Sequence, residues 1–84
     1  MMARVTVVVM PRQEVLDPQG RAVAQALRTL GFQEVSECRV GKVIRLTMDG
    51  EEADLRSRAE AMATAFLANP VTEEFTVVVE GEPA

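Results

Sequence analysis

Apolar and polar residues alternate along three stretches of the chain, as they do in strands that bury one face. The stretches are residues 3 to 10, 43 to 49 and 71 to 80. Pro11 closes the first of them, because proline has no N–H to give to a sheet. The inward face of these strands is predicted to consist of Val5, Val7, Val9, Ile44, Leu46, Phe75, Val77 and Val79.

Two other stretches repeat apolar residues every three or four positions, which is the pattern of amphipathic helices. The first helix is predicted to start at Pro18, with Asp17 as its N-cap, and to end at Gly31. The second is predicted to run from about residue 51 to about residue 68. The inward stripes are Ala22, Val23, Ala26, Leu27 and Leu30 in the first helix and Leu55, Ala59, Met62 and Phe66 in the second.

Residues 32 to 40 also look extended, and Gly41-Lys42 suits a type II′ hairpin turn into the next strand. The element order is then β-α-β-β-α-β. It predicts an α+β, ferredoxin-like two-layer sandwich, in which two helices cover one face of an antiparallel sheet. The length of 84 residues predicts a single domain, residues 1–84.

The other face of the predicted sheet is not consistently polar. Val8, Met10 and Val78 lie there among arginines and threonines. A soluble monomer would ordinarily avoid such an apolar patch, and a second copy of the chain is its simplest cover. We therefore expect a homodimer built on this face.

Composition narrows the function classes. The chain has thirteen acidic and nine basic residues, and the basic residues form no cluster of the kind that nucleic-acid binding needs. No apolar run approaches the length of a membrane span, and the N-terminus lacks the pattern of a signal peptide. Cys38 is the only cysteine, which is typical of the reducing cytoplasm.

Residues that could carry catalysis are missing from the pattern. The chain has no histidine, and Cys38 has no histidine partner. Glu51, Glu52 and Asp54 could hold a hard cation, but acids at a helix start more simply complement the helix dipole. No catalytic residue and no metal ligand is predicted.

Gly20 lies in the first turn of the first predicted helix, where glycine gives up about 1 kcal/mol of helix propensity relative to alanine. Either the first turn tolerates it, or another backbone approaches closely there. On the second interpretation an arginine at position 20 should cost little stability and weaken docking. Arg39 and Lys42 are open to two interpretations as well, as parts of a hairpin turn or as charged contacts for a partner or an anion.

Four strings of residues carry a resemblance to a known family. VLDPQG at residues 15–20, ALRTLGF at 26–32, VSECRVGKVIRL at 35–46 and LANPVTEEF at 67–75 resemble PurS in order and spacing. Within them, the pair of motifs LDPQG at residues 16–20 and R-x-G-K at residues 39–42 is the most specific part. PurS is the small subunit of phosphoribosylformylglycinamidine synthase. The resemblance covers nearly the whole chain.

The resemblance implies a non-catalytic, dimeric or higher-order subunit. It would bring together a large synthetase subunit and a glutamine amidotransferase subunit for ammonia transfer in purine biosynthesis. It would bind no cofactor itself, since the large subunit uses the ATP and magnesium. The candidate partner-interface residues are Asp17, Pro18, Gly20, Arg39, Gly41 and Lys42.

Two alternatives remain from the residues alone. A domain of this size could be a regulatory module that binds an amino acid or a nucleotide. It could also be a small enzyme such as an acylphosphatase, but Asn69 is the only asparagine and no phosphate-binding loop accompanies it.

Overall fold

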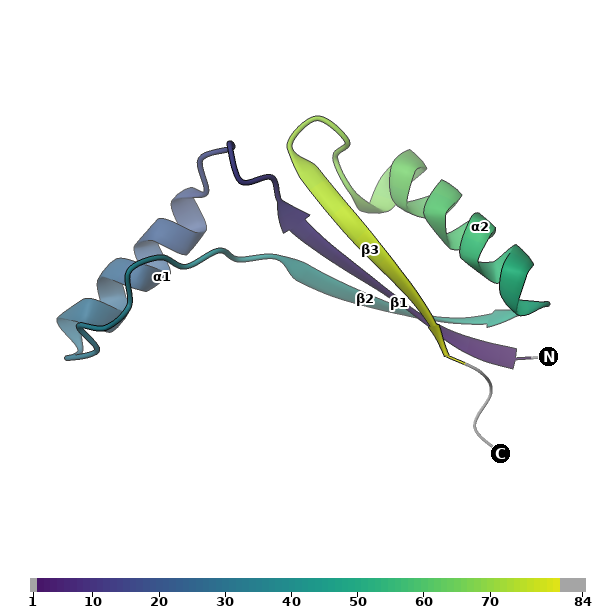
Figure 1. Ribbon diagram of the computed structural model, residues 1–84, viewed down its shortest axis with the longest axis horizontal. Coiled ribbons are helices and arrows are strands. Elements are labelled where there is room, and N and C mark those ends of the chain that lie inside the picture. Colours follow the sequence, from purple (N-terminus) through teal and green to yellow (C-terminus); the bar gives the residue numbers. More distant parts are fainter. Residues whose placement is uncertain (1, 81–84) are drawn as a thin grey trace.

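The computed structural model of the chain describes residues 2–80, and its elements follow the order β-α-β-α-β (Figure 1). The three strands are antiparallel, in the spatial order β2-β1-β3. The elements are β1 (Met2–Pro11), α1 (Pro18–Thr29), β2 (Lys42–Asp49), α2 (Glu52–Met62), a π-helical turn η1 (Ala63–Leu67) and β3 (Glu73–Glu80).

β1 is the centre of the sheet and supplies most of its core. Val5, Val7 and Val9 are fully buried. Val7 lies opposite Ile44 of β2 and Val77 of β3, so the apolar faces of the three strands are in register. The inward face predicted from the alternation is confirmed, because every predicted member belongs to the core or packs against it.

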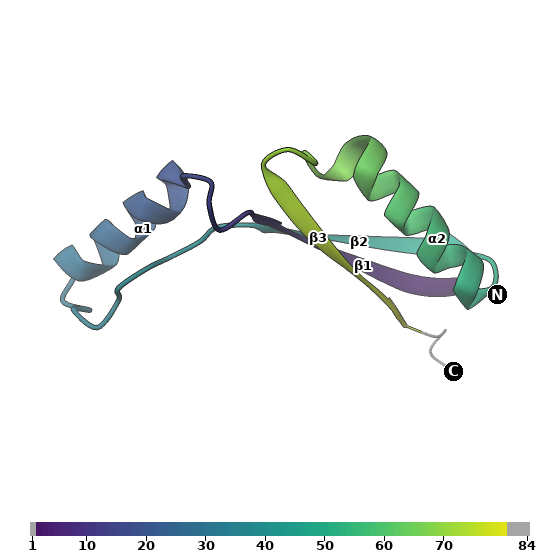
Figure 2. The same cartoon turned by 45° about the horizontal axis from the view of Figure 1, so that its top comes forward.

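α2 and the turn η1 that follows it cover this face with one leucine and two alanines. Leu55, Ala59 and Ala63 are buried, and α2 packs on β1 and β3. Arg56 marks the flank of the helix over β3, because its guanidinium donates to the carbonyl oxygen of Val77 at 2.9 Å. Figure 2 shows α2 lying against the sheet while α1 lies apart from it.

The end of the second helix departs from the predicted stripe. In η1 the N–H of Ala68 bonds to the carbonyl oxygen of Ala63 at 2.9 Å, which closes a wider turn than an α-helix has. The wider turn brings Ala63 and Ala68 into the core and leaves Phe66 87% exposed. The prediction that Phe66 belongs to the buried stripe was therefore wrong.

The predicted fourth strand and its hairpin are not formed among residues 2–80. Residues 33 and 34 form a turn, and residues 35–40 pair with no strand but lie beside α1, where the small residues Gly20 and Ala24 are buried. Arg28 donates to the carbonyl oxygen of Val35 at 2.8 Å and fixes this contact. The fold is therefore a three-stranded α+β sheet, rather than the four-stranded ferredoxin-like sandwich that was predicted.

α1 and the extended segment form an arm, residues 18–38, that projects beyond the end of the sheet (Figure 1). The Cα radius of gyration is 16.2 Å, whereas a compact chain of this length has about 12 Å. The prediction that both helices cover one sheet face was therefore wrong, because only α2 does so within residues 2–80. α1 buries its small-residue side against the chain's own extended segment.

The opposite sheet face carries the three predicted apolar residues. Val78 is 46% exposed, and Val8 and Met10 are partly buried.

None of the helices formed by residues 2–80 combines the length and the apolar character that a membrane crossing requires.

Candidate functional site

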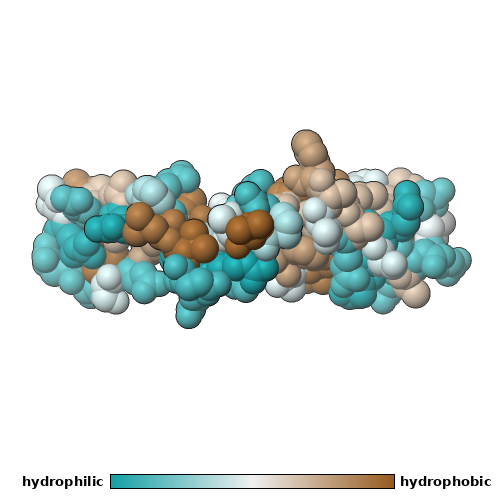
Figure 3. Space-filling view, turned by 90° about the horizontal axis from the view of Figure 1, so that it is seen from above, coloured by the Kyte–Doolittle hydropathy of each residue, from teal (hydrophilic) through white to brown (hydrophobic). Residues whose placement is uncertain are grey.

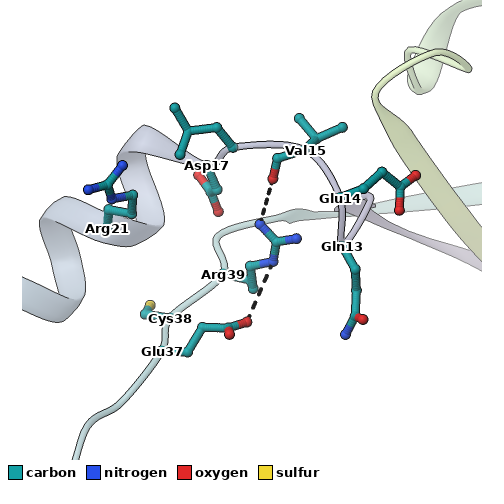
Figure 4. A pocket seen from close by; sticks show the side chains of 9 residues that line it. Gln13, Glu14, Val15, Asp17, Arg21, Glu37, Cys38 and Arg39 are labelled. Carbon is teal, nitrogen blue, oxygen red and sulfur yellow. Dashed lines mark hydrogen bonds and ion pairs between the residues drawn. The ribbon is translucent and has the colours of Figure 1, made fainter.

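The arm meets the sheet at a junction, residues 12–20 and 38–42, which contains both motifs of the sequence. A cleft of about 390 Å³ opens there (Figure 4). Its lining residues are Gln13, Glu14, Val15, Leu16, Asp17, Arg21, Glu37, Cys38 and Arg39.

The carboxylate of Asp17 links the two chain segments that make up the junction. Its Oδ1 accepts a hydrogen bond from the N–H of Gly20 at 3.0 Å, which caps α1 as predicted. Its Oδ2 accepts a second bond from the N–H of Val40 at 2.8 Å. The bond from Val40, then that from Gly20, and the nearby charge of Arg39 lower the pKa of Asp17, although partial desolvation opposes them.

Arg39 links the same two segments from the other side, because it lies in the second segment and donates to the loop before α1 (Figure 4). Its guanidinium donates to the carbonyl oxygens of Val15 at 2.9 Å and Arg12 at 2.7 Å. Oε1 of Glu37 lies 3.8 Å from Nε of Arg39 and forms an ion pair with the guanidinium. Of the two cations that the sequence offered to a partner or an anion, Arg39 thus binds the chain's own loop.

Gly20 and Gly41 let backbones pass close together. A Cβ on Gly20 would overlap the carbonyl oxygen of Cys38, and a Cβ on Gly41 would overlap the carbonyl oxygen of Val9. The close approach that Gly20 was predicted to allow therefore occurs within the chain. The expectation that Gly20→Arg costs little stability does not survive this finding.

The remaining candidates lie at the surface of the junction. Pro18 opens α1 and is exposed, and Lys42 is the exposed first residue of β2, opposite Val9. The structure thus brings Asp17, Gly20 and Arg39 together, and leaves Pro18 and Lys42 accessible.

Arg12 is a junction residue that the sequence did not reveal. Its N–H donates to the carbonyl oxygen of Thr72, and its guanidinium to that of Pro70, both at 2.9 Å. These bonds tie the junction to the turn before β3. No side-chain pattern could have shown this, because the acceptors are backbone groups far away in the sequence.

The chemistry of the junction is that of a brace. The Asp17 carboxylate and the partly buried Arg39 guanidinium are both hydrogen-bonded to backbone groups of the chain. Within residues 2–80, no three side chains of the metal-binding types come together. The arrangement holds the arm at a fixed position relative to the sheet.

A pH dependence follows from the Asp17 contacts. Because folding lowers the pKa of Asp17, its ionised form stabilises the folded chain above the unfolded pKa of about 4. This contribution is lost as pH falls through the lower folded pKa. The free energies of unfolding of wild type and Asp17→Ala, measured in urea, should differ most above about pH 5 and converge towards pH 3. A difference that grows on acidification would contradict this role of the carboxylate.

The fold and the junction define a class of protein, a small α+β chain with a braced arm and uncovered apolar surface. A family model described as "PurS: Phosphoribosylformylglycinamidine (FGAM) synthase" matches residues 4–81. The chain belongs to the PurS family, the PurS subunits of FGAM synthase in purine biosynthesis.

Relatives and solved structures agree over almost the full length. The PurS subunit of Mycobacterium leprae is 43% identical over 81 residues, which cover 96% of this chain and 100% of that protein. PurS of Methanocaldococcus jannaschii has a crystal structure with a TM-score of 0.88 at 34% identity, covering 99% of this chain and 100% of that one. A chain in the structure of PurLQS from Thermotoga maritima has a TM-score of 0.86 at 28% identity, covering 94% and 98%.

Proposed function

We propose that this chain is the non-catalytic small subunit that bridges the glutaminase and synthetase subunits of FGAM synthase. In this role it supports ammonia transfer during the ATP- and glutamine-dependent conversion of formylglycinamide ribonucleotide to formylglycinamidine ribonucleotide. The observation that carries the proposal is family membership over residues 4–81, together with the likeness to a chain of the Thermotoga maritima PurLQS structure. The partners would be PurL, the large synthetase, and PurQ, the glutamine amidotransferase.

The described residues support a role without chemistry of its own. Asp17 and Arg39 lie in a cleft, but both are engaged by backbone groups of the junction. The ATP and magnesium of the reaction would be held by the large subunit, and the complex would work in the cytoplasm. Exposed Pro18 and Lys42 remain candidates for contact with a catalytic subunit.

Self-association is part of the proposal. A chain of this size buries a modest core, and here the arm adds surface without adding core. Two apolar surfaces are available for a second copy. One is the sheet face of Val8, Met10 and Val78, and the other is the outer side of the arm.

Reconstitution tests the bridging role. The chain alone is expected to hydrolyse neither glutamine nor ATP. Added to the two catalytic subunits, it should raise glutamine-dependent formation of the amidine product. The matched control supplies ammonia directly, which removes the need for transfer, so the gain should be confined to glutamine. An equal gain with ammonia, or activity of the purified chain alone, would overturn the proposal.

The junction cleft favours one alternative function, a small-molecule-binding module. Its volume of about 390 Å³ lies in the range of ligand pockets. Calorimetric titration with nucleotides and amino acids decides between the two. Saturable binding that perturbs the resonances of Cys38 and Arg39 would favour the alternative, and no heat would favour the bridging subunit.

A further inference from the structure

The connection from η1 to β3 carries the two most exposed large apolar side chains of residues 2–80. Phe66 is 87% exposed and Val71 is 79% exposed. Their Cα atoms are at most about 18 Å apart, because only five peptide units join them, so one partner surface can cover both. The connection lies at the top in Figure 1, and Figure 3 looks down on this side and shows a hydrophobic residue that projects beyond the outline. We call residues 66–74 the η1–β3 segment.

The backbone of η1 is the reason that Phe66 is exposed. In a continuous α-helix, position 66 would follow Met62 on the side that Leu55 and Ala59 bury. The wider turn buries Ala63 instead and directs the aromatic side chain outward. Turns of this kind are rare and occur frequently at functional sites. The chain thus gives up the burial of an aromatic ring and presents it to its surroundings.

The turn that carries Val71 is held in one conformation by hydrogen bonds. The side-chain oxygen of Asn69 accepts from the N–H of Val71 at 3.0 Å. The carbonyl oxygen of Asn69 accepts from the N–H groups of Thr72 at 3.2 Å and Glu73 at 2.7 Å. In return, the N–H of Asn69 donates to Oε1 of Glu73 at 2.7 Å. A preformed apolar surface loses little conformational entropy when a partner covers it, which favours binding.

The surroundings of the segment are acidic. Residues 59–80 contain four glutamates and no lysine or arginine. Arg12 reaches the turn, but its guanidinium donates to the carbonyl oxygen of Pro70. Glu74 is exposed, and its side chain has no hydrogen bond or ion pair within the described part of the chain. A partner of this segment therefore needs basic side chains around the place where the apolar residues bind.

A hollow of about 230 Å³ opens beside the turn. Ala63, Ala68 and Phe75 give it apolar walls, and Glu73 and Glu74 add two carboxylates. Its other lining residues are Arg12, Thr64 and Pro70. Arginine and lysine side chains combine an alkyl stem with a cationic head, so they match a hollow that is partly apolar and partly acidic.

We propose that the η1–β3 segment docks on one catalytic subunit of FGAM synthase, at an apolar recess bordered by arginine or lysine side chains. Phe66 and Val71 enter the recess, and one basic side chain of the partner enters the hollow beside Glu74. This inference rests on the bridging role in the proposed function. It assigns a further surface, because Phe66 and Val71 lie outside both surfaces that are available for a second copy.

A second copy of this chain fits the segment poorly. The net charge of the chain is -4, and a two-fold contact would place the glutamates of one segment against those of the other. An anionic membrane surface would be repelled for the same reason. A partner with a basic border gains from these charges instead, because opposite charges across an interface accelerate association and fix its orientation.

Truncation of the aromatic side chain tests the docking site. Binding of each catalytic subunit to the immobilised chain is measured by biolayer interferometry. Phe66→Ala should weaken the binding of one subunit at least about tenfold, since buried aromatic residues dominate protein interfaces, and should leave the other unchanged. Phe66→Leu is the matched control, which keeps an apolar side chain and should retain most of the affinity. Unchanged binding of both subunits, or equal weakening of both, would overturn the proposal.

Reversal of one charge tests the chemistry of the partner. Glu74→Lys should slow association with that same subunit at least about threefold at low salt, and the difference from wild type should shrink as salt is raised. Glu34→Lys makes the same change in net charge in the turn after α1 and is the control, expected to associate as wild type does. Faster association of Glu74→Lys, or no change, would contradict a basic border.

A photo-cross-link identifies the occupant of the recess. The photoreactive amino acid p-benzoylphenylalanine in place of Phe66 keeps an aromatic ring at this position. Irradiation of the mixture of all three subunits should join the chain to the subunit whose binding Phe66→Ala weakens. Cross-links only to other copies of this chain would assign the segment to self-association and overturn the proposal.

These outcomes separate the inference from the proposed function. A wild-type chain that binds neither catalytic subunit overturns the bridging role and the docking site together. A wild-type chain that raises glutamine-dependent turnover, with Phe66→Ala equally effective at every concentration, overturns only the docking site.

Discussion

Leu55→Ala should destabilise the folded chain by about 2–5 kcal/mol, the usual cost of removing a fully buried leucine side chain. Leu55 is only 2% exposed and packs in the core between α2 and the sheet. A chain of this length has a total stability of roughly 4–12 kcal/mol, so the loss is a large share of the whole. The melting temperature should fall by at least about 10 °C.

Phe66→Ala is the matched control for Leu55→Ala. Both residues belong to the stripe that helical spacing predicts, but η1 turns Phe66 out of the core and leaves it 87% exposed. Its truncation should change the free energy of unfolding of the monomer by no more than about 0.5 kcal/mol. Unfolding in urea compares the two variants, and both are measured at the same low protein concentration because self-association adds to apparent stability. Equal losses from both variants would mean that the second helix keeps its α-helical register to the end.

Gly20→Ala should be destabilising although alanine is the better helix former. The added Cβ would overlap the carbonyl oxygen of Cys38, and that backbone is held by the bonds of Arg39 and Val40, the two residues that follow it. Overpacking of this kind costs about 1–3 kcal/mol, against a gain of about 1 kcal/mol in helix propensity. Gly20→Arg should lose more, since it adds the same Cβ and a longer chain.

The arm provides the specific readout for this variant. Hydrogen exchange of residues 32–40 should accelerate in Gly20→Ala while β1 stays protected, because the clash opens the arm before the sheet. Gln19→Ala, at the exposed neighbouring position, is the control and should change neither quantity. A Gly20→Ala chain that is as stable as wild type, with unchanged exchange, would show that the segment of Cys38 can move aside at no cost.

The sequence predicted those elements of the fold whose signals lie in neighbouring residues. The alternation of β1 and β2 reports burial of one face, and the Asp17-Pro18 pair reports a helix start, so both were predictable from the sequence. The place of residues 32–40 was not. Extended backbone has the same local signature whether it pairs in a sheet or lies along a helix, and the choice depends on the small face formed by Gly20 and Ala24.

The candidate site shows the same division. The motif residues Asp17, Gly20 and Arg39 were named from the sequence as candidates for contact with a partner, and the structure brings them together within the chain. Their partners were not predictable, because they are backbone groups of Val15, Cys38 and Val40 that no residue type identifies. The interpretation of Gly20 as a place for another backbone was correct in its physics, and the structure supplies that backbone from the chain itself.

The double contact of Asp17 restricts which amino acids can replace it. Capping alone would accept serine, threonine or asparagine, since each offers one oxygen to the helix N-terminus. The second bond, to the N–H of Val40, needs another acceptor on the same side chain. Asparagine would present an amide N–H there, donor against donor. Helix capping alone would allow several residues at position 17, but the second bond makes the position selective for a carboxylate. The orientation of α1 relative to the sheet therefore depends on the chemical identity of this one side chain.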